Sequence, residues 1–204
     1  EGYKFLAISI LATFLVLFFS KFLGFILILI TIWVYYFFRD PERFSIDDDK
    51  YLVSPADGLI TDVSEKSGPE ELRLENTTFT RVSIFMNVFN CHVNRVPSSG
   101  KVEEIYYKPG KFLNASLDKA SEENERNYFK IKLNNGEEII IIQIAGLIAR
   151  RIVCEVEQGQ ELKQGERIGM IRFGSRVDIY FKNKKVLAKL GQNVVSGESL
   201  IASD

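Results

Sequence analysis

The stretch that decides the fold is an octapeptide that occurs twice near the C-terminus. Residues 159–166 read GQELKQGE, and residues 191–198 read GQNVVSGE. Both copies carry glycine at their first and seventh positions, where a tight turn needs a positive φ that residues with a Cβ disfavour. Apolar residues follow each copy, Ile168 after the first and Leu200 after the second. The repeat therefore predicts two tight turns of the same kind in one β domain.

Paired turns of this kind resemble the hammerhead turns of lipoyl and biotinyl carrier domains. The resemblance implies a compact β-sandwich or flattened barrel with local two-fold symmetry. A carrier domain also needs a lysine at the tip of an exposed hairpin between the two turns. The segment between the copies contains Gly174 and Ser175 instead, and Lys184 and Lys185 lack the flanking methionines of a carrier tip. A carrier that awaits lipoylation is therefore the weakest of the functional interpretations.

Runs of β-branched and aromatic residues predict further strands upstream of the repeat. They are residues 59–63, 81–88, 102–107, 128–133, 138–144 and 151–155. Asn134, Asn135 and Gly136 predict a hairpin turn between two of these strands. We therefore expect a mainly β protein, preceded by an N-terminal helical membrane anchor.

The anchor is predicted from an apolar stretch that runs from Phe5 to Phe38 with Lys21 as its only charged residue. One straight helix of that length would measure about 51 Å, well beyond a hydrocarbon core of about 30 Å. Ser20, Lys21 and Gly24 offer a break, so a helical hairpin or a re-entrant pair fits better than one span. A cleaved signal peptide is the alternative, although its apolar core would cover only about 7–15 residues.

A charged collar follows the anchor at residues 39–43, which read RDPER. We therefore predict an anchor and collar at residues 1–43 and a catalytic β domain at residues 44–204. Arg39 and Arg43 lie close to the apolar stretch, and positive residues favour the cytoplasmic side of a membrane. The prediction is a cell-membrane protein with its β domain on the cytoplasmic side.

Composition excludes several classes of function. The net charge is -1 over 204 residues, which gives no basic face for nucleic acid. Cys91 and Cys154 are too few for a disulfide framework, so we expect free thiols in a reducing compartment. The pair Cys91 and His92 has no second pair of ligands nearby, so no metal site is predicted.

Three compact polar motifs in the β domain supply the groups that activate a hydroxyl. Residues 54–58 (SPADG) contain Asp57, residues 90–95 (NCHVNR) contain His92, and residues 172–176 (RFGSR) contain Ser175. His92 is the only histidine in the chain. An acid, a histidine and a serine are the parts of a nucleophile with its base. Each also has a plain structural reading, as a turn aspartate, a histidine at a strand end or a turn serine.

In their order and spacing these motifs resemble the short, bacterial-type phosphatidylserine decarboxylase proenzymes. The resemblance covers nearly the whole chain. Its further marks are FFRDPER at residues 37–43, FMNVFNCHVNR at 85–95, PGKF at 109–112 and NER at 124–126. Most of these marks are weak by themselves, but together, behind a membrane segment, they are specific.

The resemblance implies a pyruvoyl enzyme that makes its own cofactor. The Ser175 hydroxyl attacks the Gly174 carbonyl to give an ester, and β-elimination leaves a dehydroalanine that hydrolyses to an N-terminal pyruvoyl group and ammonia. Gly174 leaves its carbonyl open to attack, and serine supplies both the nucleophile and the leaving β-oxygen. The substrate amine then condenses with the pyruvoyl ketone, and the conjugated imine accepts the electrons released with carbon dioxide.

Asp57 and His92 are expected to serve this chemistry, and the role of His92 stays open. Longer family members carry two histidines three residues apart in this region, and the second is assigned to self-cleavage. Here the corresponding pair is His92 and Arg95. His92 is the processing base oriented by Asp57, the proton donor in decarboxylation, or both in turn. Arg95 stays protonated and is expected to bind a phosphate or carboxylate of the substrate.

Lys111 and Arg126 are two further candidates for substrate binding. They flank a polar segment that would close over the lipid headgroup, with a cation near the phosphate. A solvated loop is the alternative for this segment.

The predicted function is pyruvoyl-dependent decarboxylation of phosphatidylserine to phosphatidylethanolamine, after self-cleavage between Gly174 and Ser175. The predicted partners are a phospholipid in the membrane and the large and small fragments of the precursor, without nucleic acid. The sequence leaves open a homo-oligomer, and also an archaetidylserine as the substrate. The alternative function is a membrane-anchored, lipoyl/biotinyl-like β-sandwich adaptor without catalytic activity, which would remain one intact chain.

Overall fold

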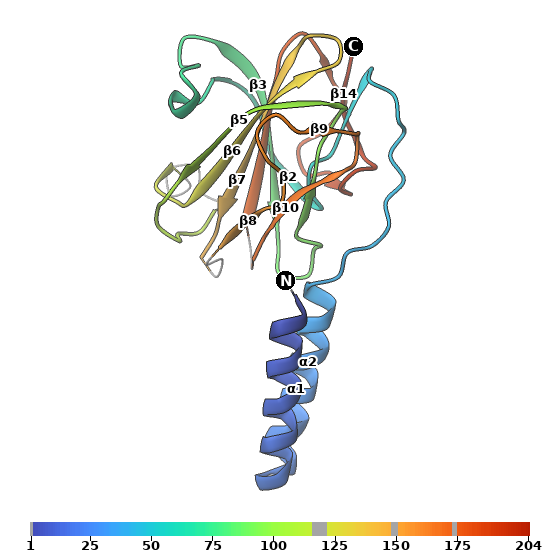
Figure 1. Ribbon diagram of the computed structural model, residues 1–204, viewed down its shortest axis with the longest axis vertical. Coiled ribbons are helices and arrows are strands. Elements are labelled where there is room, and N and C mark those ends of the chain that lie inside the picture. Colours follow the sequence, from blue (N-terminus) through green and yellow to red (C-terminus); the bar gives the residue numbers. More distant parts are fainter. Residues whose placement is uncertain (1, 116–121, 148–150, 173–174) are drawn as a thin grey trace. The chain divides into compact units, whose positions relative to one another are not determined.

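The computed structural model describes residues 2–115, 122–147, 151–172 and 175–204 (Figure 1). The chain divides into two compact units, Glu1–Pro41 and Glu42–Asp204. The first unit is helical and the second is built from strands. The boundary predicted from the charged collar lies close to this division.

The helical unit is a hairpin of two apolar helices, α1 (Gly2–Phe19) and α2 (Lys21–Phe37). The chain turns at Ser20, whose extended backbone and side chain cap the start of α2. The helices lie side by side, and the hydroxyls of Thr13 and Thr31 are 3.0 Å apart across the hairpin. Each hydroxyl thereby has a polar partner, which apolar surroundings require.

Among the described residues, α1 is long and apolar enough to cross a membrane by its length and composition. α2 is apolar as well but one residue shorter. Large apolar side chains are exposed along both helices, as Phe14, Phe18 and Phe22 illustrate. An apolar surface of this extent is suited to lipid, so the unit favours membrane association.

The described part of the β unit contains fourteen strands. They are β1 (Tyr51–Val53), β2 (Gly58–Ser67), β3 (Thr78–Met86), β4 (Val93–Arg95), β5 (Gly100–Lys108), β6 (Arg126–Leu133), β7 (Glu138–Ala145), β8 (Ile152–Cys154), β9 (Glu161–Leu162), β10 (Arg167–Ile171), β11 (Ser175–Phe181), β12 (Lys185–Val186), β13 (Asn193–Val194) and β14 (Leu200–Ser203). The prediction of a mainly β protein is confirmed. The predicted turn around Gly136 joins β6 to β7, and this glycine has a φ of 87°.

Eight of the described strands form one curled antiparallel sheet, visible in Figure 1, in the order β13-β2-β3-β11-β7-β6-β5-β9. Two small sheets, β1-β14-β12 and β4-β10-β8, complete the unit. The strand β11 lies near the centre of the large sheet, between β3 and β7. Residues at its start are therefore held on both sides by backbone hydrogen bonds.

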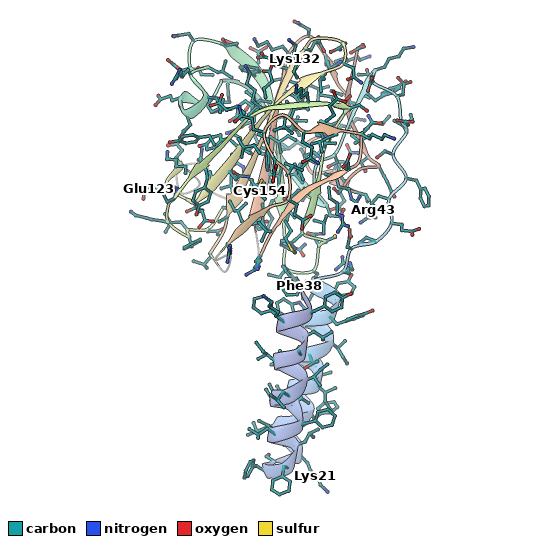
Figure 2. The ribbon with its side chains drawn as sticks, in the orientation of Figure 1. Lys21, Phe38, Arg43, Glu123, Lys132 and Cys154 are labelled. Carbon is teal, nitrogen blue, oxygen red and sulfur yellow. The ribbon has the colours of Figure 1, made fainter. Side chains whose placement is uncertain are left out.

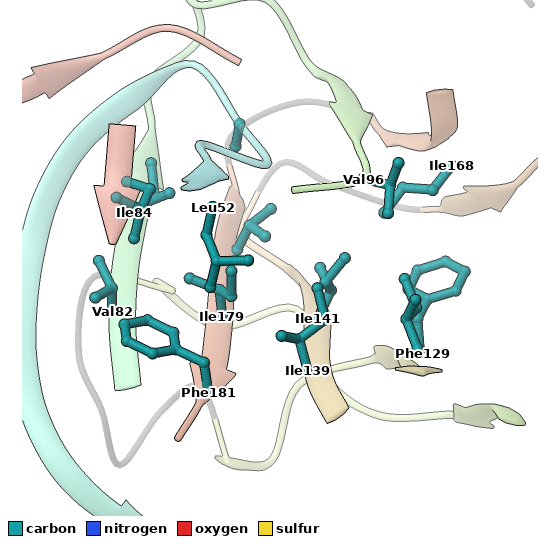
Figure 3. Packing of buried hydrophobic residues seen from close by; sticks show 14 of the residues in the cluster. Leu52, Val82, Ile84, Val96, Phe129, Ile139, Ile141, Ile168, Ile179 and Phe181 are labelled. Carbon is teal, nitrogen blue, oxygen red and sulfur yellow. The ribbon is translucent and has the colours of Figure 1, made fainter. Parts of the chain in front are cut away.

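The core fills the space between the large sheet and the two small ones (Figure 3). Side chains alternate along β11 as strand geometry requires. Val177, Ile179 and Phe181 point into the core, where they meet residues from the small sheets such as Leu52 and Ile168. The opposite face of the large sheet carries a second buried cluster that includes Tyr128 and Tyr180.

The β unit has an internal two-fold symmetry that runs through the β11–β7 pair. Outward from this pair the sheet order reads β3, β2, β13 on one side and β6, β5, β9 on the other. Both halves carry the same irregularity, a register shift between Ile60 and Asp62 in β2 and between Val102 and Glu104 in β5. The two halves therefore share their pairing pattern residue by residue.

Hydrogen bonds of the repeated turns follow the same internal two-fold symmetry. The N–H of Val53 donates to the Pro97 carbonyl at 2.9 Å, and the N–H of Arg95 donates to the Pro55 carbonyl at 3.0 Å. The first-position glycines of both octapeptides also make matching bonds, Gly191 to Ile60 at 2.9 Å and Gly159 to Val102 at 2.8 Å. All four glycines of the repeat have φ between 77° and 89°. The sequence repeat is thus a repeat of structure, and the likeness to carrier domains stays a prediction.

Register fixes which residues correspond. In β1 and β4 the register shifts at the same place, so Leu52 corresponds to Asn94. The remaining correspondences follow from the ladders of the large sheet and the two turns: Asp57 with Ser99, Thr80 with Asn127, Met86 with Leu133, Phe181 with Gln143, Ser196 with Gln164, and Ser175 with Glu137.

Candidate active site

Ser175 is the first residue of β11 and is completely buried. It pairs with Met86 of β3 on one side and with Ala145 of β7 on the other. Its hydroxyl lies 3.4 Å from Sδ of Met86, to which it donates a hydrogen bond. A thioether sulfur is a weak acceptor, so this bond orients the hydroxyl at little cost. Gly174, the other half of the predicted cleavage site, lies outside the described residues.

His92 is also completely buried, and its ring has a defined tautomer. Nδ1 lies 3.0 Å from the carbonyl oxygen of Asn90, and a carbonyl can only accept, so Nδ1 carries the proton. The lone pair of the neutral ring is then on Nε2, the atom from which a general base acts. The His92 carbonyl accepts from the N–H of Ile171 at 3.3 Å. His92 therefore lies beside the end of β10, from which the chain leads to Ser175.

Asp57 lies in the turn before β2 and is nearly buried. Its Oδ1 accepts a hydrogen bond of 2.8 Å from the N–H of Ser196, in the second repeat turn. Both carboxylate oxygens also accept from Nη2 of Arg43, at 2.9 and 3.2 Å. Arg43, labelled in Figure 2, belongs to the charged collar. Within the described residues, an arginine and a turn N–H therefore hold the carboxylate that was predicted to orient His92.

The turn that contains Asp57 packs closely against the end of β3. A Cβ on Gly58 would lie 2.2 Å from the carbonyl oxygen of Phe85, so only glycine fits there. Because Phe85 precedes Met86, the turn of Asp57 and the start of β11 flank the same strand end. Asp57, His92 and Ser175 thus all lie at one end of the large sheet, which we call the serine end.

The three predicted substrate-binding cations have different surroundings. Arg95 donates to the carbonyl oxygen of Gly165 in the first repeat turn at 2.9 Å. Lys111 is exposed and forms an ion pair of 2.7 Å with Glu123, whose pKa is lowered by this hydrogen bond. Arg126 begins β6 at the serine end and lies 3.4 Å from the hydroxyl of Tyr128. Lys111 and Arg126 lie at the serine end, whereas Arg95 contacts the first repeat turn.

A chain of buried amides, which the sequence analysis did not assign, leads to the serine. Nδ2 of Asn94 lies 3.8 Å from the same Met86 sulfur that Ser175 contacts. Oδ1 of Asn94 accepts from Nε2 of Gln143 at 2.8 Å, and Oε1 of Gln143 lies 3.3 Å from Nδ2 of Asn127. All three amide side chains are at most 2% exposed. A sequence signal exists for Gln143 alone, a polar residue inside the apolar run of β7.

Asn124 connects the neighbouring loop to the same place. Its Nδ2 donates to the carbonyl oxygens of Leu113 and Ala145, at 2.8 and 2.7 Å. Ala145 is the β7 partner of Ser175. The NER motif therefore fixes the segment around Leu113 beside the serine strand.

An apolar cavity of about 260 Å³ opens beside the same strand end. Its lining comes from the end of β3 and from three loop segments, and consists of Phe85, Met86, Asn87, Val88, Asn114, Ala115, Gly146 and Leu147. Leu147 and the nearby Phe89 are more than 60% exposed. The serine end therefore presents apolar surface to its surroundings as well as buried polar groups.

Comparison with known proteins identifies the family. A model of the family described as phosphatidylserine decarboxylase matches residues 30–202. A phosphatidylserine decarboxylase proenzyme of Pelagibacter ubique (strain HTCC1062) is 65% identical over 202 residues, which cover 99% of this chain and 94% of the relative. Proenzymes of the same name from Rickettsia typhi and Rickettsia prowazekii are each 51% identical over 203 residues, covering 99% of this chain and 88% of each relative.

The chain belongs to the phosphatidylserine decarboxylase family. The family predicted from the order of the motifs is thereby confirmed. The match includes Asp57, His92 and Ser175, together with the whole run of strands from β1 to β13. The relatives are called proenzymes, a name for a precursor that is processed. The serine end, which contains Asp57, His92 and Ser175, lies within the matched residues.

Proposed function

We propose that this chain is the precursor of a phosphatidylserine decarboxylase that cuts itself between Gly174 and Ser175. Its reaction is the decarboxylation of phosphatidylserine to phosphatidylethanolamine, as membership in the family indicates. The observation that supports the cleavage site best is the position of Ser175. It is a buried hydroxyl at the start of a central strand, next to a weak acceptor and at the same sheet end as Asp57 and His92.

Self-cleavage needs a base, a nucleophile and two eliminations. The Ser175 oxygen attacks the Gly174 carbonyl carbon while a base takes its proton, and the amide nitrogen leaves as an amine, giving an ester. Loss of the Ser175 α-proton expels the Gly174 carboxylate and leaves a dehydroalanine. Water adds to this residue and ammonia departs, so that a ketone remains at the new N-terminus. Every oxygen and nitrogen in this sequence comes from the chain or from water.

His92 is the group best suited to take the first proton. It is the only histidine, and its tautomer leaves the lone pair on Nε2. The same atom, once protonated, can return a proton to a substrate carbanion in the later reaction. Asp57 supplies a carboxylate at the same sheet end, held in place by Arg43 and by the N–H of Ser196. We assign both proton transfers to His92 and electrostatic support to Asp57.

The residues around Ser175 fit a pyruvoyl group. Self-cleavage would remove the Ser175 Oγ with the Gly174 carboxylate and leave a methyl group beside the neutral Met86 sulfur, so only a weak contact would be lost and no charge would be left unpaired. The pyruvoyl ketone supplies an electrophilic carbonyl that takes up the substrate amine and accepts the electrons left behind by carbon dioxide. The chain's own residues would hold the group between Met86 and Ala145, and His92 would move the proton.

The lipid is expected to approach the serine end from a membrane. The apolar cavity beside Met86 offers a place for the apolar part of a phospholipid. Lys111 and Arg126 lie at the same end and are the candidates for its phosphate. The apolar helix α1 would keep the enzyme at the bilayer, with the β unit on the cytoplasmic side.

The processing proposal is tested by Ser175→Ala in the full chain. We expect one uncut, inactive chain, because no hydroxyl remains, whereas the natural sequence gives a large fragment and residues 175–204 with a blocked N-terminus. Gel electrophoresis and intact mass measure the cut, and carbon dioxide release from phosphatidylserine vesicles measures turnover. Two fragments from the alanine variant would refute the cleavage site. Turnover that survives borohydride plus substrate would refute the pyruvoyl group.

A further inference from the structure

The amide chain at the serine end is unusual for the place in which it lies. Asn94, Gln143 and Asn127 sit in the inner layer of the β unit, beside aliphatic residues such as Ile84 and Val177. A buried amide costs free energy unless its hydrogen bonds are made, and even then its net gain is only about 1 kcal/mol per bond. Apolar residues of similar size would serve the core as well or better.

The internal symmetry shows that the fold accepts apolar residues at two of these three positions. The counterparts of Asn94 and Gln143 are Leu52 and Phe181, both completely buried in the main core cluster. The counterpart of Met86 is Leu133, which is also buried. The same backbone is therefore built at the other end of the sheet with an aliphatic and aromatic cluster. The stability of the fold therefore does not explain why these side chains are amides.

The geometry gives the amides a definite orientation. Because Oδ1 of Asn94 accepts from Gln143 at 2.8 Å, the Nδ2 group of Asn94 must face the other way, toward the Met86 sulfur. Gln143 is fixed in turn by Asn127. A methionine side chain has three rotatable bonds and packs in many ways. A donor that is itself held in place removes much of this freedom from the sulfur.

We propose that Asn94, oriented by Gln143 and Asn127, is a positioning residue that fixes the Met86 sulfur against Ser175. The sulfur then holds the Ser175 hydroxyl in one rotamer before self-cleavage. Since sulfur accepts weakly, the hydroxyl is ordered and yet gives up the bond easily when a base takes its proton. This inference rests on the proposed self-cleavage at Ser175 and adds the groups that prepare the nucleophile.

The test compares cutting rates of full-length variants that copy the opposite end of the sheet. Met86→Leu and Asn94→Leu should each slow cutting by about ten- to a hundredfold, the effect of a small misplacement of a reacting group. Met86→Leu conserves volume and copies Leu133, so it should fold even where Asn94→Leu does not. Cutting is followed by gel after synthesis, with the folded fraction measured by circular dichroism.

A matched control separates positioning from structural support. Gln164 is a buried glutamine of the first repeat turn, where its Nε2 donates to the carbonyl oxygens of Tyr51 and Pro97. Gln164→Leu should lower the melting temperature and leave the cutting rate of the folded protein unchanged. A structural role alone for Asn94 would give this same pattern.

The double variant Asn94→Leu, Met86→Leu tests whether the residues act in series. It should cut at the rate of the slower single variant, because Asn94 acts through the sulfur. Multiplied effects in the double variant, or a natural rate in folded Met86→Leu, would overturn the inference. Failure of the natural sequence to yield residues 175–204 would refute the proposed function instead, so the two failures are distinguishable.

Discussion

The two ends of the large sheet share a backbone and differ in their chemistry. At the serine end Asp57 accepts a hydrogen bond from the N–H of Ser196 at 2.8 Å, and at the other end Ser99 accepts from the N–H of Gln164 at 3.1 Å. Position for position these bonds are the same. The turn therefore needs an oxygen acceptor, which serine supplies, and the negative charge of Asp57 is additional. The two ends therefore share the turn and differ in one charge.

The hollows at the two ends differ as well. The end opposite the serine carries the larger groove, about 980 Å³, and charged and polar residues such as Asp49, Lys101 and Lys132 line much of it. The cavity at the serine end is smaller and apolar. The site proposed above for the apolar part of the phospholipid is therefore the smaller of these two cavities.

Two single variants, Asp57→Ser and Ser99→Asp, test this comparison by giving each position the residue of its counterpart. Asp57→Ser should have the largest effect of the predictions made here. Asp57→Ser should slow cutting more than about a hundredfold, since the charge that supports His92 is lost. The free energy of unfolding should fall by about 1–3 kcal/mol, because Arg43 loses the Asp57 carboxylate while the turn keeps an acceptor. Gel time courses and thermal melts measure the two effects. Ser99→Asp is the control and should cut at the natural rate; normal cutting by both variants would remove Asp57 from the mechanism.

Alanine at the two equivalent glycines should separate stability from processing. A Cβ on Gly58 would lie 2.2 Å from the Phe85 oxygen, and one on Gly100 would lie 2.4 Å from the Lys132 oxygen. Both variants should lose about 1–3 kcal/mol of unfolding free energy from overpacking. Only Gly58→Ala should also slow cutting, by about tenfold, because it displaces the turn of Asp57. Equal cutting rates in the two variants would contradict the assignment of the serine end.

Arg43 forms an ion pair with Asp57 at the serine end. The counterpart of Asp57 at the other end is Ser99, which is uncharged and cannot form such a pair. Arg43→Gln keeps a donor of shorter reach but removes the charge that holds Asp57 at 2.9 Å. We expect cutting to slow by about three- to tenfold, a smaller effect than removal of the carboxylate itself. Arg43→Lys should recover part of the rate. An unchanged rate in Arg43→Gln would show that Asp57 is held well enough by Ser196.

The exposed pair of Lys111 and Glu123 should have the smallest effect. The hydrogen bond to Lys111 lowers the pKa of Glu123, so any stabilisation is present above the unfolded pKa and is lost as the pH falls through the folded one. For an exposed pair we expect no measurable change in melting temperature for Glu123→Gln at neutral pH. Lys111→Gln should raise KM on vesicles by about two- to threefold if Lys111 binds the phosphate. An unchanged KM would remove Lys111 from the binding site.

Local patterns in the sequence predicted the mainly β class and six of the fourteen described strands, but not β11, which begins at Ser175. Runs of β-branched and aromatic residues predicted six strands, and the glycines of the octapeptide predicted two turns, because both depend on near neighbours along the chain. The order of the motifs predicted the family. By contrast, the bond from Gln143 to Asn94 joins residues 49 positions apart, and that from Arg43 to Asp57 depends on how the collar folds back. Register between distant strands decides such contacts, and no local pattern encodes it.

The place of Ser175 at the head of an interior strand has a consequence for the lifetime of the protein. The proposed cut before Ser175 would assign β11 to one chain and its neighbours β3 and β7 to another. The precursor can unfold and refold as a single molecule, but the mature protein must find its other chain again, in a step that depends on concentration. Cleavage at this position would therefore make folding an event that each molecule completes once, and structure lost afterwards would be regained slowly if at all.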